Sequence, residues 1–355
     1  MSPLAMDPSV LQLVWFGLIA VLWIGFLILE GFDFGVGMLI PFLGKNDKER
    51  RVLVNSIGPV WDANEVWLLT AGGAMFAAFP GWYATLFSGL YLPFFLILFG
   101  LIIRGLAFEY RVKRQDPVWR NRWDWCAAIG SFIVSLVLGV GFANFIIGLP
   151  IKVAETSPVH VYTGGFFGLF SPFALLGGLV LPTLFLFHGA IFLALKTRGT
   201  IHDRARAFAE KVGLAAIGGG AVFLLWSNLA YSTGLIGWAL MLLAAGGLVA
   251  AWLMVKQDRE GWAFVGTTVA TLAIAVGIFV RMYPNLGFDN SATLDAPLNI
   301  LTASATPMTL GIMTWAAVIF VPIVLTYQAW TYWVFRKRIS VKNIPDDVPE
   351  PAPVA

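Results

Sequence analysis

Long apolar segments fill most of this 355-residue chain, and they constrain its fold more than any other feature. A helix needs about 20 predominantly apolar residues to cross the hydrocarbon core of a bilayer. Segments of that length recur along the whole chain and predict about nine transmembrane helices. The predicted spans are residues 10–43, 52–79, 83–108, 124–148, 169–195, 212–233, 236–255, 262–283 and 308–335.

The composition agrees with a membrane protein. Hydrophobic residues make up 59% of the chain and charged residues only 12%, whereas soluble domains carry about 25% charged residues. We therefore predict an all-α, polytopic membrane bundle. The first, second and last predicted spans exceed the bilayer thickness, so they should tilt, kink or project. Gly31, Gly35, Gly37 and Pro41 offer break points in the first span, and Gly58-Pro59 offers one in the second.

Basic residues alternate from one predicted loop to the next. All 23 Lys and Arg residues except Arg104, Lys152 and Arg281 follow the odd-numbered spans. Because cytoplasmic loops are enriched in Lys and Arg, we expect the N-terminus outside and the C-terminus in the cytoplasm. Residues 1–343 are predicted to form one membrane-embedded domain. Residues 344–355 lack apolar periodicity and are predicted to form a disordered cytoplasmic tail.

Four carboxylates lie within the first two predicted spans: Glu30 and Asp33 in the first, and Asp62 and Glu65 in the second. Each pair is spaced i, i+3 and so shares one helix face. Both pairs lie roughly 15–20 Å from the cytoplasmic ends of their helices, and the short connection makes these helices antiparallel neighbours. We expect the four acids to meet at one level. Intramembrane acids usually face the protein interior and mark ion or proton routes.

An alternative exists for each acid taken singly. A buried carboxyl can stay neutral and bond only to helix backbone or to the indoles of Trp61 and Trp67. For four acids in one cluster, a proton route is favoured over purely structural hydrogen bonding. Asn64 supplies a polar partner under either interpretation.

Histidine and cysteine are scarce. His160 and His202 fall in predicted loops, so only His188 lies within a span, and Cys126 is the single cysteine. Paired haem ligands need more intramembrane His or suitably placed Met, and a lone His in an apolar helix is more often a packing residue. We therefore expect no metal or redox centre in this chain, and no internal disulfide is possible.

Glycines and aromatic residues receive structural interpretations. Gly31, Gly35 and Gly72-Gly73 lie within apolar spans, so they indicate close helix packing rather than phosphate-binding loops. Aromatic side chains near the span ends are typical of an interfacial belt. They include Trp82, Tyr83, Trp119, Trp123, Trp125, Trp330, Tyr332 and Trp333.

Two segments around the acids resemble a known family. Residues 30–38 (EGFDFGVGM) and 55–67 (NSIGPVWDANEVW) are similar to subunit II of the cytochrome bd-type quinol oxidases. Residues 70–78, 120–125, 130–131 and 313–315 add further matches. The resemblance runs from the first span to the last, with its most specific motifs in the N-terminal third. The sixth and seventh spans match only by hydropathy.

This resemblance implies a subunit that pairs with a haem-bearing subunit I in a bacterial or archaeal cell membrane. The complex would oxidise quinol and reduce dioxygen to water, with protons drawn from the cytoplasm. The family's two b-type haems and its haem d are ligated in subunit I, which leaves no cofactor and no catalytic residue here. A quinone bound as a structural lipid and small accessory subunits also occur. No nucleic-acid partner is expected.

The resemblance also assigns residues. The family's subunit II lends acids to a proton route, and the matching residues here are Glu30, Trp61 and Asp62; Asp33 and Glu65 join them from the predicted cluster. Glu30 replaces an Asp that is found in some members, so its carboxyl reaches one methylene further.

Two other function classes compete. A proton-coupled secondary transporter would also bury acids, but it would typically have inverted repeats with broken helices in both halves. Here the four acids fall in the first two spans without a counterpart in the second half. A purely structural scaffold is disfavoured by the clustered acids.

Overall fold

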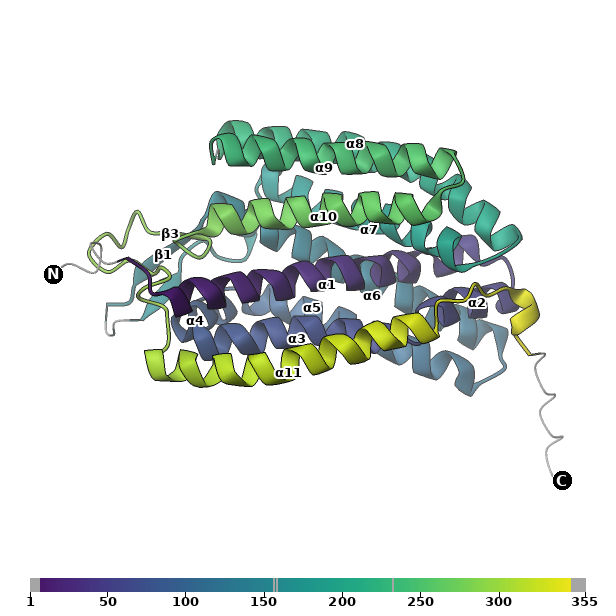
Figure 1. Ribbon diagram of the computed structural model, residues 1–355, viewed down its shortest axis with the longest axis horizontal. Helices are drawn as coiled ribbons and strands as arrows, with labels where there is room; N and C mark the ends of the chain where they lie inside the picture. The colour runs from purple at the N-terminus through teal and green to yellow at the C-terminus, as the bar shows by residue number, and fades with distance from the viewer. Residues whose placement is uncertain (1–6, 156, 158, 232, 346–355) are drawn as a thin grey trace, which may run out of the picture.

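The computed structural model describes residues 7–155, 157, 159–231 and 233–345, and its long helices run side by side in one bundle (Figure 1). The helices are α1 (Val10–Leu43), α2 (Asp47–Ile57), α3 (Trp61–Ala78), α4 (Pro80–Gly89), α5 (Tyr91–Tyr110), α6 (Pro117–Ile147), α7 (Pro172–Lys196), α8 (Thr200–Ala230), α9 (Leu235–Lys256), α10 (Glu260–Met282) and α11 (Pro307–Val334). Short 3-10 turns are η2 (Arg111–Lys113), η3 (Phe167–Leu169) and η4 (Val341–Asn343). The all-α prediction is confirmed.

Helix starts coincide with capping residues in the sequence. The side chain of Ser9 accepts a hydrogen bond from the backbone of Gln12 at the start of α1, and Ser171 does the same for α7. Thr306 caps α11 in the same way. Such caps satisfy backbone N–H groups that have no partner within the first turn of a helix.

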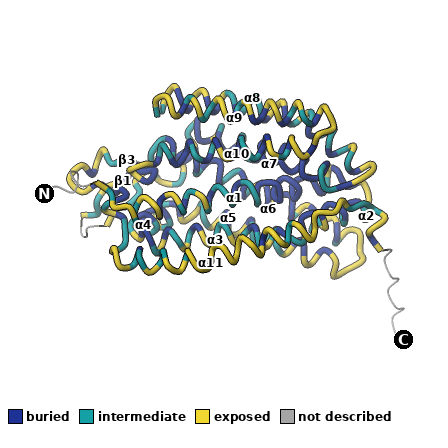
Figure 2. Tube along the Cα trace, viewed as in Figure 1, coloured by how far each residue is buried: buried dark blue, intermediate teal, exposed yellow. Residues whose placement is uncertain are grey.

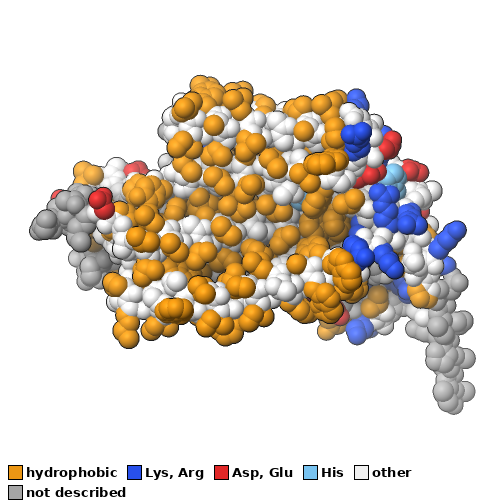
Figure 3. All heavy atoms as spheres, viewed as in Figure 1, with side chains coloured by type: hydrophobic (Ala, Val, Ile, Leu, Met, Phe, Trp, Pro, Cys, Tyr) orange, Lys and Arg blue, Asp and Glu red, His pale blue; other side chains and the backbone are white. Residues whose placement is uncertain are grey.

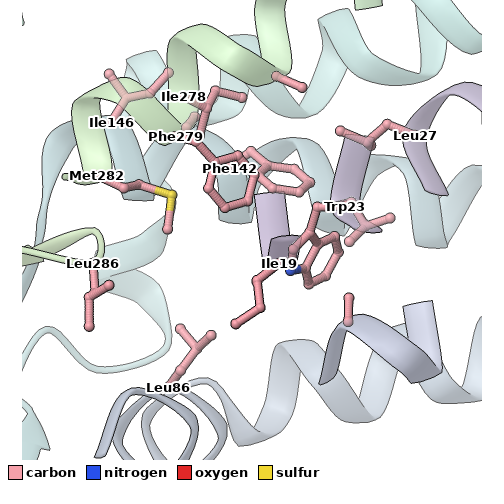
Figure 4. Packing of buried hydrophobic residues seen from close by; sticks show 14 of the residues in the cluster. Ile19, Trp23, Leu27, Leu86, Phe142, Ile146, Ile278, Phe279, Met282 and Leu286 are labelled. Carbon is pink, nitrogen blue, oxygen red and sulfur yellow. The ribbon is translucent and has the colours of Figure 1, made fainter. Parts of the chain in front are cut away.

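Helix α1 forms the axis of the bundle. It contacts α3, α6, α7, α10 and α11, whereas exposed residues follow the outer helices α8, α9 and α11 (Figure 2). Trp23 of α1 packs edge-on against Phe142 of α6, with ring centroids 5.4 Å apart. Ile19 and Leu27 flank this contact, and Ile278 of α10 lies beside it (Figure 4). The buried side chains of α1 therefore join both halves of the bundle.

The number of candidate spans differs from the prediction. Among the described residues, eight helices are long and apolar enough to cross a membrane, rather than nine. The exception is the predicted span 52–79, which is divided into α2 and α3 by a turn at residues 58–60. The break at Gly58-Pro59 is thus confirmed. Helix α3 is only about 27 Å long, and it begins with Asp62, Asn64 and Glu65, which lower its hydropathy.

The predicted break points in the first span are not breaks. Helix α1 continues through Pro41 as one helix of 34 residues. Its glycines serve packing, as predicted: a side-chain carbon at Gly31 would lie 2.6 Å from the ring of Phe185. Gly35 lies against the backbone of Phe185 and Gly189 of α7. Small residues at these positions let α1 and α7 approach closely.

The packing interpretation is wrong for Gly72 and Gly73. A side-chain carbon at Gly73 would meet nothing within 4 Å, and one at Gly72 would meet only Phe87, at 3.8 Å. Both glycines instead border an apolar hollow of about 580 Å³, which is lined by aromatic side chains of α3, α4 and α5. The interfacial interpretation is wrong for Trp82, whose side chain is buried between Phe16 and Phe79.

A small sheet closes one end of the bundle. Strands β1 (Leu149–Val153), β2 (His160–Tyr162) and β3 (Phe288–Asp289) pair in the order β2-β1-β3. Strand β1 is antiparallel to β2 and parallel to β3. The sheet joins the connections between residues 148–169 and 283–308, which the predicted topology places outside the cell. Strands this short carry too little periodicity to be recognised in the sequence.

We call the opposite end of the bundle the basic end. It contains α2, the start of α8 and the C-terminal ends of α7 and α11. Figure 3 shows the Lys and Arg side chains gathered there. Ion pairs hold it together: Asp124 lies 2.6 Å from Arg111 and 2.9 Å from Arg50. Glu49 lies 2.6 Å from Arg204. Burial opposes ionisation of Glu49, but hydrogen bonds from Arg204 and from the backbone of Lys45 hold its pKa below the ordinary value.

The start of the predicted tail packs against this end. Ile344 is buried, and the carbonyl of Pro345 accepts a hydrogen bond from Arg51. The rest of the predicted tail, residues 346–355, lies outside the described residues. Which end faces the cytoplasm stays a prediction from the positive-inside rule.

The contact between α1 and α7 yields a test of helix packing. A side-chain carbon at Gly189 would lie 2.7 Å from the backbone of Gly35. Gly189→Ala should therefore lower the free energy of unfolding by about 1–3 kcal/mol, as overpacking does. The midpoint of thermal unfolding of the purified protein measures this loss. Gly246→Ala in α9 is the matched control, because nothing lies within 4 Å of its added carbon; equal midpoints for both variants would contradict the prediction.

Candidate functional site

The structure buries the two acids of α1 completely. The side chains of Glu30 and Asp33 are both 0% exposed. They lie one turn apart on the part of α1 that faces α3, as their spacing predicts. Glu65 of α3 reaches the same region from the neighbouring helix, and its side chain is 20% exposed. Three of the four predicted acids are therefore brought together.

Arg104 of α5 lies between these acids. Its Nη1 atom is 2.5 Å from Oε1 of Glu30 and 2.5 Å from Oε1 of Glu65, and its side chain is 0% exposed. One guanidinium thus links α1, α3 and α5. Arg104 lies within the predicted span 83–108 but was not among the predicted site residues. The signal was present, because an arginine in an apolar helix needs a charged or polar partner.

Aromatic rings enclose the guanidinium of Arg104. Its central carbon lies 4.8 Å from the ring centre of Phe34, 5.2 Å from that of Phe108 and 5.7 Å from that of Trp61. A cation is attracted to the face of an aromatic ring, and more strongly where water is excluded. Trp61, a predicted site residue, therefore forms a wall of the arginine pocket. Its ring also packs edge-on against Phe108.

A second set of polar contacts surrounds Asp33. The amide nitrogen of Asn64 donates to Oδ2 of Asp33 at 2.6 Å and to the carbonyl of Leu29 at 3.3 Å. The oxygen of Asn64 accepts from the hydroxyl of Tyr332 at 2.9 Å and from Gln328 at 3.2 Å. Asn64 therefore connects the acids of α1 to the last two turns of α11. Neither Gln328 nor Tyr332 was predicted to belong to the site, because α11 lies far away in sequence.

The Trp67 indole does not bond an acid, as one alternative supposed. Its nitrogen donates to Oε1 of Gln328 at 3.0 Å. Trp67 thus supports the glutamine that holds Asn64.

Asp62 does not join the cluster. It is exposed on the outer face of α3, one turn before Glu65. Residues spaced i, i+3 are about 60° apart around a helix. Glu65 therefore reaches Arg104 from the edge of the buried face of α3, whereas Asp62 lies beyond that edge. The face of α3 that carries Asp62 also exposes Val66 and Leu69, at 48% and 74%.

Two nitrogen atoms of the buried arginine are unsatisfied. Within the described residues, Nε and Nη2 of Arg104 have no hydrogen-bond partner. Buried polar groups usually find partners in protein or ordered water. The cluster can therefore take up further hydrogen bonds beyond the two ion pairs.

His188 is engaged on both ring nitrogens. Nδ1 lies 2.6 Å from the hydroxyl of Thr267, and Nε2 lies 3.1 Å from the carbonyl of Ile28. The ring stacks on Phe264 at 4.4 Å. Within the described residues, no group of three or more His, Cys, Asp or Glu side chains could hold a metal ion. His188 therefore behaves as a packing residue in this structure.

Known proteins share both the sequence and the fold. The model of the cytochrome bd terminal oxidase subunit II family matches residues 11–335. Subunit 2 of cytochrome bd-I ubiquinol oxidase from Escherichia coli strain K12 is 38% identical over 371 residues, which cover 95% of this chain and 97% of that protein. Subunit 2 of cytochrome bd ubiquinol oxidase from Bacillus subtilis is 42% identical, with 93% and 97% covered.

A solved structure agrees in fold. One chain in the structure of bd oxidase from Geobacillus thermodenitrificans superposes with a TM-score of 0.71, covering 92% of this chain and 99% of that one. At a sequence identity of 17%, this similarity supports a shared fold and nothing more. On the family match and the two long, closely related sequences, this chain belongs to the cytochrome bd terminal oxidase subunit II family.

Proposed function

We propose that this chain is the haem-free subunit II of a quinol oxidase and that its buried carboxylates form part of a proton route toward the haems of a partner subunit. Family membership makes the chain a multi-pass membrane subunit of a bacterial respiratory oxidase. The observation that carries the finer proposal is the cluster of Glu30, Glu65 and Arg104 inside the bundle. Dioxygen reduction to water by that complex would consume protons drawn from the cytoplasm.

Charge balance gives the cluster its capacity to hold a proton. Two of the three carboxyl groups contact the guanidinium of Arg104 and the third, Asp33, is bonded to Asn64, so full ionisation would leave negative charge in excess at low dielectric. Uncompensated charge within a bilayer costs several kcal/mol. A proton on Glu30, Asp33 or Glu65 removes this cost, and the ion pairs to Arg104 keep the acceptors in place. Such a group can take a proton from one side and release it to the other.

The route would enter from the basic end. Tyr332 lies in the last turn of α11, and its hydroxyl leads through Asn64 to Asp33. Asp33 and Glu30 are one helical turn apart, and Glu30 shares Arg104 with Glu65. These contacts support an ordered path from the cytoplasmic side into the bundle.

Asp62 would lie at the end of the proton route that faces the partner subunit. A charged side chain exposed to lipid would be costly, so the face of α3 with Asp62, Val66 and Leu69 is expected to be covered by protein. The outer face of α11 beside it is also strongly exposed and apolar. We assign this joint face of α3 and α11 to the haem-bearing subunit I, which makes the chain an obligate partner.

The carboxylates themselves provide the first test. In the assembled complex, Glu30→Gln and Asp62→Asn keep the shape of the side chain but delete the titratable group. Quinol-driven oxygen consumption should fall by roughly 10²-fold, the lower end of what a positioned proton-transfer group contributes. Glu30→Asp and Asp62→Glu should retain more activity, because a carboxyl remains.

Glu210→Gln is the matched control, since Glu210 lies at the basic end and pairs with Arg206 outside the cluster. Haem absorption must stay normal in every variant. Unchanged oxygen consumption in both Glu30→Gln and Asp62→Asn would remove the support for the proton route.

Arg104 provides a test of the electrostatics. Arg104→Gln leaves Glu30 and Glu65 without a cation, and removing one partner of a buried ion pair costs about 3–5 kcal/mol. We expect a lower midpoint of thermal unfolding for the complex. The double variant Arg104→Gln/Glu30→Gln should recover part of this loss, because one uncompensated acid is gone. Equal midpoints for the single and double variants would show that the acids and the arginine are not coupled.

The described residues of this chain do not fit a haem. Both nitrogens of His188 are engaged by Thr267 and Ile28, and the ring is packed on Phe264. We therefore propose that the b- and d-type haems belong to subunit I. A quinone and small accessory subunits remain proposed partners without assigned contacts.

Purification from native membranes tests this assignment. The chain should copurify with a haem-absorbing partner, and His188→Ala should leave every haem absorption band in place. Loss of one specific band while both subunits stay assembled would overturn the assignment. A colourless chain that purifies without a partner and transports a solute in vesicles would instead favour the proton-coupled transporter.

A further inference from the structure

A second hollow opens at the basic end, between α1, α7, α10 and the end of α11. Its volume is about 490 Å³, within the range of about 300–1,000 Å³ that is usual for small-molecule sites. Its inner wall is apolar and largely aromatic, with Phe32, Phe192 and Phe264 stacked or edge-packed on one another. Tyr332 also lines the hollow.

Three cations form the rim of this hollow. Lys196 is the last residue of α7, and Arg336 and Arg338 follow α11. Among the described residues, the ammonium group of Lys196 has neither an ion pair nor a hydrogen bond. Arg336 lies over the ring of Trp333 at 4.4 Å and donates to its carbonyl. Arg338 lies 3.5 Å from Glu260, whereas neither Lys196 nor Arg336 forms an ion pair with an acid in the described part of the chain. The rim therefore carries excess positive charge.

Backbone hydrogen bonds fix the two sides of the rim together. The N–H of Ile339 donates to the carbonyl of Lys196 at 2.9 Å, and the N–H of Arg198 donates to the carbonyl of Ile339 at 3.1 Å. The segment after α11 is thus tied to the end of α7. Because of this tie, Lys196 and Arg338 stay beside the mouth of the hollow without a ligand to hold them.

An apolar chamber under a cationic rim suits an amphiphile with an anionic head. Basic pockets between transmembrane helices on the cytoplasmic side are typical sites for acidic lipid headgroups. A free anion would leave the aromatic chamber unused, and a neutral lipid would leave the rim uncompensated. We propose that this hollow binds one anionic phospholipid, with its phosphate at Lys196 and Arg336 and an acyl chain along Phe32 and Phe264. The proposal does not depend on the proton route.

Titration of the delipidated complex with phosphatidylglycerol, followed by native mass spectrometry, tests this site. Each basic residue beside an anionic lipid contributes about fivefold in affinity. Lys196→Gln/Arg336→Gln should therefore weaken phosphatidylglycerol binding roughly 25-fold, and phosphatidylcholine should bind weakly to both forms. Lys337→Gln is the matched control, because Lys337 is exposed, adjacent in sequence and outside the hollow.

A variant whose side chain fills the hollow distinguishes binding of a lipid from binding of a free anion. Leu195 is half-buried and lines the hollow, so Leu195→Trp should occlude it and reduce phosphatidylglycerol binding at normal haem content. Inorganic phosphate should not displace the lipid. Equal effects of Lys337→Gln and the double variant, equal binding of phosphatidylcholine, or displacement by phosphate with no effect of Leu195→Trp would each overturn the proposal.

Discussion

The ion pairs of Arg104 are the interaction on which the interior of this bundle depends. Helices in a bilayer gain little from hydrophobic association, because lipid is as apolar as their side chains. A guanidinium that contacts acids of α1 and α3 supplies a specific, directional link among three helices. Removing water from these charges is expensive, so the arrangement requires all partners together. Arg104, Glu30 and Glu65 consequently form one unit rather than three independent residues.

Close backbone approach makes this unit possible. Gly100 of α5 lies against Gly130 of α6, where a side-chain carbon at Gly130 would be 2.6 Å from the carbonyl of Gly100 and 3.3 Å from the backbone nitrogen of Arg104. Arg104 thus belongs to helix α5, which packs closely against α6 through small residues. Gly35 and Gly189 do the same for α1 and α7. The close helix contacts at these glycines therefore allow the buried charges to meet.

Much of the fold and part of the site could be predicted from the sequence. Span positions follow from hydropathy because a bilayer imposes one length on every helix. Glu30, Asp33 and Glu65 could be grouped because their pairing depends on spacing within two adjacent helices. The position of Arg104 within a span indicates that it needs a charged partner, but no local pattern states which distant helix supplies that partner, and the same holds for Tyr332. The outward position of Asp62 could not be predicted, because residues spaced i, i+3 are about 60° apart around a helix and the spacing does not state where the buried face of that helix ends.

The positions of Asp62 and Glu65 on α3 have a physical consequence. Both acids lie at the start of this one helix, about 60° apart around its axis. Glu65 lies against Arg104, while Asp62 lies outward near the positive N-terminal end of α3, where a carboxylate is stabilised by the helix dipole. Two acids one turn apart therefore experience different surroundings, one enclosed and one at the surface. The two carboxyls thus span α3 from the enclosed guanidinium of Arg104 to the exposed face of the helix.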